Sequence, residues 1–153
     1  MKKLILLIMF FILPLNIFAE EKTLFSLNEV TASPGSNITI KLNVKNNPKF
    51  GILTAKLHYD MEKLEYVSSE IKGMKKAVLK GSESNDKGIV AFYAITLDSS
   101  DLFDDTDTLL IVDFKIKETT EEDSEIRLEI TDFGKDENTP IVFDSVNGKV
   151  KIN

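Results

Sequence analysis

The residue types that most often carry out chemistry are scarce in this sequence. It contains no cysteine and a single histidine, His58, which excludes thiol nucleophiles, Cys-ligated zinc and His-rich metal clusters. His58 falls at an outward position of a predicted strand, next to Tyr59 and Asp60, and no serine of a nucleophile motif lies nearby. We therefore interpret His58 as a surface residue rather than a general base.

Carboxylates supply the remaining candidate chemistry. Oxygen ligands at short spacing could bind calcium, but the central glycine and closing glutamate of an EF-hand are missing from the aspartate-rich loop, which holds Asp98, Asp101, Asp104, Asp105 and Asp107. A second acidic turn holds Glu121, Glu122 and Asp123, whereas glycoside hydrolysis needs two carboxyls placed across a cleft, one of them in an apolar setting. We interpret both segments as solvated loops, and we expect no catalytic residue, metal site or cofactor in this chain.

The first 19 residues have the pattern of a secretory signal peptide. Lys2 and Lys3 precede an apolar run that contains Pro14 and ends at Ala19, before an acidic residue. The run is shorter than the about 20 apolar residues that a transmembrane helix needs. We expect cleavage after Ala19 and a secreted single domain, residues 20–153, with no membrane association after cleavage; an uncleaved anchor is the alternative.

The mature chain would be acidic. Without residues 1–19 it holds 17 basic and 25 acidic residues, a balance of −8, and its sole arginine is Arg127. Nucleic-acid binding takes its affinity from clustered lysine and arginine, so we expect no nucleic-acid partner. We interpret the one compact basic cluster as a solvated face; it comprises Lys72, Lys75, Lys76 and Lys80.

Apolar and polar residues alternate with a period of two along most of the mature chain, which is typical of half-buried strands. The alternation is clearest over residues 38–44, 53–59, 110–116 and 126–130, and further candidate strands cover 24–30, 64–67, 89–95, 141–143 and 150–152. Turn sequences lie between or before these segments, at Pro34-Gly35, Asn85-Asp86-Lys87-Gly88 and Asn147-Gly148.

About nine short strands without crossover helices predict an all-β fold, a two-sheet antiparallel sandwich. Residues 69–80 fit either a short helical turn or an edge strand. The segment 89–95 is apolar on both faces, because Val90, Phe92 and Ala94 alternate with Ile89, Ala91, Tyr93 and Ile95. A sandwich strand needs one apolar face for the core, so a loop covers the second face or a partner binds it.

Five segments resemble the cohesin family, in the order and at the spacing of that family. They are Ser33-Pro34-Gly35-Ser36 with the alternating strand after it, Gly51 through Leu57-His58-Tyr59-Asp60 to Leu64-Glu65 and Val67, Gly88 to Tyr93, Leu109 to Lys117, and Asn147-Gly148-Lys149-Val150. The resemblance covers essentially residues 23–153.

The resemblance implies a nine-stranded sandwich of jelly-roll topology that has no catalytic activity and binds a dockerin on another secreted protein. Cohesins serve in cellulosome-type assemblies, where they dock polysaccharide-degrading enzymes onto a scaffold. Dockerins carry calcium in their own loops, so calcium would belong to the partner, and polysaccharide would be reached through the partner.

By the family pattern Val90 and Phe92 point inward, which places Tyr93 on the recognition sheet. Tyrosine offers a large contact area with one polar group and is favoured at interface hot spots, so Tyr93 is the predicted anchor. The predicted partner-binding set holds the outward residues of two strands: Tyr93, Ala91, Ile89, Ile95, Ile52, Thr54, Lys56 and His58. Well-known cohesins often have Asn and Asp at the places of Ile52 and Thr54, so a partner of this chain would meet a more apolar surface. Some relatives have an acidic residue before the closing strand that contacts the dockerin. This residue has no secure match in the present sequence, where Glu137 lies near the corresponding place.

Two other functions fit the same fold class. A carbohydrate-binding module usually stacks sugar rings on flat aromatic residues, best supplied by tryptophan. The chain has no tryptophan, and Tyr59 and Tyr66 fall at core-like positions, which leaves Tyr93 as the candidate platform. A generic extracellular adhesion or structural domain requires nothing beyond the fold.

Overall fold

The computed structural model describes residues 21–98, 102–104 and 106–153, so the predicted signal peptide lies outside the described residues. These residues form strands and connecting loops, without a helix. The eleven strands are β1 (Thr23–Leu27), β2 (Glu29–Ala32), β3 (Asn37–Lys45), β4 (Ile52–His58), β5 (Leu64–Ile71), β6 (Leu79–Ser84), β7 (Ile89–Ile95), β8 (Thr108–Ile116), β9 (Ser124–Gly134), β10 (Phe143–Val146) and β11 (Gly148–Ile152).

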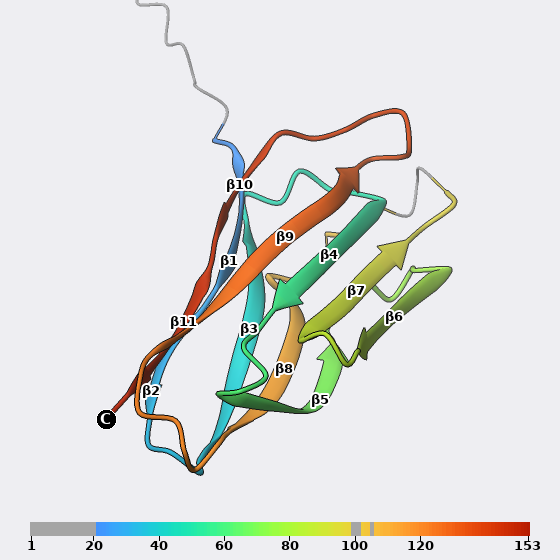
Figure 1. Cartoon of the computed structure of the whole chain (residues 1–153). Coiled ribbons are helices and arrows are strands. Elements are labelled where there is room, and N and C mark those ends of the chain that lie inside the picture. The colour runs from blue at the N-terminus through green and yellow to red at the C-terminus, as the bar shows by residue number, and fades with distance from the viewer. Residues whose placement is uncertain (1–20, 99–101, 105) are drawn as a thin grey trace, which may run out of the picture.

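The strands form two sheets packed face to face (Figure 1). One sheet has the order β10-β1-β3-β8-β5, and the other has the order β2-β11-β9-β4-β7-β6. Neighbouring strands are antiparallel except for β1 with β10 and β2 with β11, which pair in parallel. The predicted all-β sandwich is confirmed, with these two parallel pairs added at its sheet edges.

Two differences account for eleven strands where the sequence predicts about nine. The segment 24–30 is divided at Asn28, so that β1 belongs to the first sheet and β2 to the second. The Asn28 side chain bonds to β3 across this break, accepting from the Lys41 amide at 2.6 Å and donating to the Thr39 carbonyl at 3.2 Å. The undecided segment 69–80 ends in an edge strand, β6, which pairs with β7.

The core lies between the sheets and is filled by the inward residues of the alternating strands. In β4 and β7 every second residue is buried, beginning with Leu53 and Val90. Phe92 and Phe114 are fully buried, and Tyr59 and Tyr66 pack edge-on or tilted against the Phe114 ring. Both tyrosines therefore belong to the edge of the core, as their positions in the sequence predict.

Two of the three predicted turns form where the sequence predicts them. Gly35 and Gly88 have φ angles of 80° and 69°, a left-handed conformation that glycine adopts without steric cost. Asn85 closes the β6–β7 hairpin, because its side-chain oxygen accepts from the amides of Lys87 and Ile89. Asn147-Gly148 differs from a hairpin turn: it is the point where the chain crosses from β10 in one sheet to β11 in the other.

Candidate partner-binding face

The eight predicted partner-binding residues lie together on the outer face of the six-stranded sheet. They form four cross-strand pairs between β4 and β7: Ile52 with Ile95, Thr54 with Tyr93, Lys56 with Ala91, and His58 with Ile89. All eight side chains are half-buried, while the residues between them are buried in the core. The structure thus confirms which face of each strand points outward; binding at this face stays a prediction.

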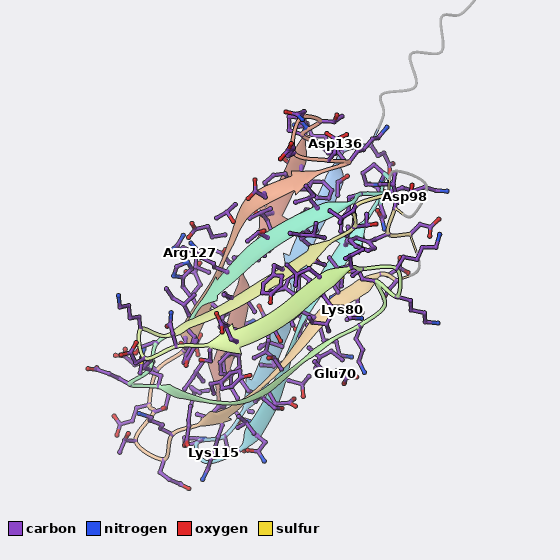
Figure 2. All side chains as sticks on the ribbon, turned by 90° about the vertical axis from the view of Figure 1, so that its right-hand side faces the viewer. Glu70, Lys80, Asp98, Lys115, Arg127 and Asp136 are labelled. Carbon is purple, nitrogen blue, oxygen red and sulfur yellow. The ribbon has the colours of Figure 1, made fainter. Side chains whose placement is uncertain are left out.

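Two further strands extend these pairs into rows across the sheet. β9 lies beside β4 and places Asp132 next to Thr54 and Glu129 next to Lys56. β6 lies beside β7 and places Leu79 next to Ile95 and Gly81 next to Tyr93. In Figure 2 the four strands run side by side, with Arg127 toward one end of the face and Asp136 beyond the other end.

Tyr93 lies at the middle of the face, over the backbone of the edge strand. A Cβ atom added to Gly81 would lie 2.5 Å from the Tyr93 hydroxyl oxygen and 2.7 Å from the ring carbon that carries it. The Tyr93 ring can therefore occupy this position only because Gly81 has no side chain. This contact holds the ring against β6 and leaves part of it exposed, so that little entropy would be lost if a partner covered the ring.

A charged cluster lies at one end of the face. His58 Nε2 is 2.7 Å from Glu129 Oε2, and an Arg127 guanidinium nitrogen is 3.3 Å from the same oxygen. The hydrogen bond from His58 is the largest cause that lowers the pKa of Glu129 below its ordinary value, and the nearby charges of Lys56 and Arg127 act in the same direction. These mutual contacts fix the orientation of the His58 side chain.

The other end of the face carries a groove of about 400 Å³. Its apolar lining includes Ile52, Ile95 and Phe143, and its acidic lining comprises Asp132, Asp136 and Glu137. The loop between β9 and β10 supplies one wall and is held by an Asp136 turn, in which the carboxylate accepts from the Asn138 amide at 2.9 Å. That hydrogen bond is the largest cause that lowers the pKa of Asp136.

Exposed apolar side chains lie near the end of β7, at the edge of the sheet formed by β6. Leu79 is 54% exposed, Val78 66% and Leu97 83%, and the Val78 amide donates to the Ile95 carbonyl at 2.9 Å. These residues and those of β9 are not predicted from the sequence, because alternation alone does not show which strands are neighbours in a sheet. Glu137, which has no secure match to the acidic contact of some cohesins, lines the groove.

The outer face of the five-stranded sheet carries polar side chains that bond to one another, beside the apolar Ile111 and Val146. Asp113 accepts from the Thr39 hydroxyl at 2.7 Å and from the Ser68 hydroxyl at 3.1 Å, which joins three adjacent strands. Thr108 donates to the Asn43 side chain at 2.9 Å. Hydroxyls and carboxylates that are already paired offer less to a protein partner, so the two outer faces differ in kind.

The acidic segments weighed above have ordinary surroundings where they are described. Asp104 pairs with Lys49 at 3.2 Å, while Asp101 and Asp105 lie outside the described residues. Asp123 pairs with Lys149 at 3.1 Å and accepts from the Ile152 amide, which is the largest cause of its lowered pKa. Within the described residues no three or more histidine, aspartate or glutamate side chains gather as metal ligands do, and no helix long and apolar enough to cross a bilayer is found.

Comparison with protein families gives one match over most of the chain. The model of the cohesin domain matches residues 24–152. None of the curated protein sequences compared with the chain matches it.

Solved structures with the same fold include three cohesins from different organisms. The seventh ScaB type I cohesin from Pseudobacteroides cellulosolvens is 21% identical, with a TM-score of 0.74 over 86% of this chain and 92% of that one. The sixth cohesin of scaffoldin B from Acetivibrio cellulolyticus, solved with a mutant Cel5 dockerin, is 26% identical, with a TM-score of 0.71 over 87% and 100%. A non-cellulosomal cohesin from the archaeon Archaeoglobus fulgidus is 21% identical, with a TM-score of 0.70 over 87% and 92%.

Proposed function

The chain belongs to the cohesin family, and from this premise we propose that it is a secreted, non-catalytic module that binds a dockerin-bearing protein through the outer face of β4 and β7. Dockerin complexes of similar cohesins, such as that from Acetivibrio cellulolyticus, support the class of partner. The observation that carries the choice of face is the row of half-buried apolar and aromatic side chains around Tyr93.

The composition of this face suits a protein partner better than a sugar. Interfaces concentrate their binding energy in a few residues near the centre, and tyrosine is enriched among them. Tyr93 is flanked by Ile52, Ile95 and Leu79 rather than by further aromatic rings. Tyr59 and Tyr66 pack against Phe114 instead, and Phe143 in the groove packs edge-on against Phe25 and Phe133. The outward residues of β4 and β7 therefore include one aromatic ring, Tyr93, and form no extended platform for sugars.

Secretion is part of the proposal and rests on residues 1–19, with cleavage after Ala19. An acidic protein without cysteine stays soluble and needs no disulfide in an oxidising medium. The partner's dockerin would supply the calcium. Polysaccharide would be contacted by the partner's catalytic or binding modules rather than by this chain.

Titration calorimetry tests the proposal with residues 20–153, which contain all eleven strands. Recombinant dockerin modules from secreted proteins of the producing organism are titrated in calcium and again in EDTA. We expect at least one dockerin to bind in calcium and to lose binding in EDTA. If no dockerin binds while the chain is retained on an insoluble polysaccharide, the function is carbohydrate binding; if neither occurs, an adhesion or structural role is the better account.

A further inference from the structure

The groove lies at the C-terminal end of β9, opposite the charged cluster of His58, Arg127 and Glu129. It combines an apolar floor with an acidic rim. Ile52 and Ile95 lie in one row of the sheet, and Phe143 and Ile141 from the following segment complete the apolar lining. Asp132 projects from β9 beside Thr54, while Asp136 and Glu137 come from the loop that forms the wall. Apolar side chains and carboxylates therefore line the same groove.

The chain neutralises the charge of this groove only in part, because the charge of Lys135 acts on Asp136. No lysine or arginine is among its described lining residues, and Lys135 lines a separate hollow with Lys22. The Asp136 carboxylate accepts a hydrogen bond from the Asn138 amide within the β9–β10 loop. Asp132 and Glu137 are exposed, and no hydrogen bond or ion pair engages either side chain in the part of the chain that the structure describes.

The opposite end of the face is built differently. Glu129 is shared by His58 and Arg127, and Lys56 is its neighbour across the strands. One carboxylate therefore faces the basic side chains of Arg127 and Lys56 there, whereas the groove lining holds three carboxylates and no lysine or arginine. A partner that covers the whole face would leave those carboxylates poorly solvated unless it supplied a positive charge.

We propose that this groove binds a lysine or arginine side chain of the partner, with its methylene stem against Ile52 and Ile95 and its charged end between Asp132 and Glu137. Long basic side chains bury their stems on apolar surface while the charge stays at a polar edge, and a guanidinium or ammonium group gains charge-assisted hydrogen bonds from carboxylates. The inference rests on the proposed function, since it names the chemistry of the same partner.

A small-ligand experiment tests the groove without the dockerin. Acetyl-arginine amide and its neutral isostere acetyl-citrulline amide are titrated into ¹⁵N-labelled residues 20–153, and amide chemical shifts are followed. We expect saturable shifts at Ile52, Ile95 and residues 131–134 with the arginine compound alone. The double variant Asp132→Asn with Glu137→Gln should lose them, and the matched control Glu121→Gln with Glu122→Gln should keep them. Equal shifts with citrulline, unchanged shifts in the double variant, or shifts spread evenly over surface carboxylates would overturn the inference.

The dockerin that binds in calorimetry gives the second test. We expect its affinity to fall about 3- to 10-fold in the double variant, because the ion pairs lie at a partly solvated rim, and the loss should shrink as salt is raised. Thermal melting of the double variant should match the wild type. Equal dockerin affinity in both proteins would refute the groove while leaving the proposed function intact, whereas failure of every dockerin to bind would refute the proposed function and leave the groove to the small-ligand experiment.

Discussion

Phe92 and Tyr93 are consecutive residues of β7 with opposite surroundings. Phe92 is fully buried among the core side chains, so Phe92→Ala leaves a cavity as well as losing apolar burial. We expect it to lower the free energy of unfolding by about 3 to 5 kcal/mol. Urea denaturation measures the loss; a change below about 1 kcal/mol would place Phe92 outside the core.

Tyr93→Ala should have the opposite consequence. The ring lies over Gly81 on the outer face and contributes little to the core. We expect dockerin binding to weaken by about 1 to 3 kcal/mol, as for a hot-spot residue, with a thermal midpoint almost unchanged. Calorimetry and thermal melting of the same sample give both values, and a large loss of stability with unaltered affinity would mean that the two faces are assigned backwards.

Glu129, in the charged cluster with His58 and Arg127, makes the stability of the folded protein depend on pH. Its pKa is lowered chiefly by the hydrogen bond from His58, so the unfolded chain binds this proton more tightly than the folded protein does. The resulting stability is present above pH 4.5, the ordinary glutamate pKa, and is lost as the pH falls through the lower folded pKa. In Glu129→Gln, denaturation midpoints should therefore fall less steeply below pH 4.5 than in the wild type. Parallel curves for the two proteins would show that this contact does not contribute.

At the scale of single residues the sequence predicts which side chains face outward, and the structure confirms it for all eight site residues. Alternation with a period of two is sufficient for β4, whereas in β7, which is apolar on both faces, the resemblance to cohesins decides which residues point inward. Alternation is not sufficient for contacts between strands distant in sequence, such as the hydrogen bond of His58 with Glu129, 71 residues apart. The position of Tyr93 over Gly81 could not be predicted from the sequence either, because it depends on the pairing of β6 with β7.

Among the elements, β6 has the largest effect on the proposed binding face. It borders β7, and its Gly81 leaves the space that the Tyr93 ring occupies. Gly81→Ala should displace the ring and weaken dockerin binding several-fold, because the anchor loses its fixed orientation. Stability should change little, since Gly81 has no positive φ angle. Calorimetry on this variant checks the effect; unchanged affinity would show that the orientation of Tyr93 is not needed.

The β6–β7 hairpin requires glycine at its last turn position. Gly88 has a φ of 69°, and an added Cβ would lie 2.4 Å from the Tyr59 carbonyl oxygen. Gly88→Ala therefore adds a steric overlap to a left-handed conformation that alone costs about 1 to 2 kcal/mol. We expect a loss of at least that size in chemical denaturation, and a neutral result would contradict the turn geometry.

The elements show where prediction from sequence stops. Turn sequences and alternation locate most strands, but the break at Asn28 depends on its bonds to β3, which no local pattern reveals. The undecided segment 69–80 holds the end of β5, a connecting loop and the first two residues of β6, and its side chains show no regular alternation. The parallel pairs of β1 with β10 and β2 with β11 join the two ends of the chain, and such long-range pairing leaves no trace in short windows.

The whole molecule presents two outer faces of different chemistry. On the five-stranded sheet, Thr39, Ser68 and Asp113 bond to one another. On the six-stranded sheet, half-buried apolar residues surround Tyr93, with an acidic groove at one end. This asymmetry predicts that a partner engages one side of the sandwich, and that the polar side stays in solvent.

Cross-saturation NMR with a bound dockerin tests this central claim most directly. Methyl-labelled residues 20–153 are mixed with the unlabelled dockerin, and saturation of the dockerin is followed into the methyl groups of this chain. The account predicts transfer to Ile52, Ala91 and Ile95 on the outer face of β4 and β7, and none to Ile111 on the outer face of β8. Transfer to Ile111 with none to Ile52, Ala91 and Ile95 would contradict it.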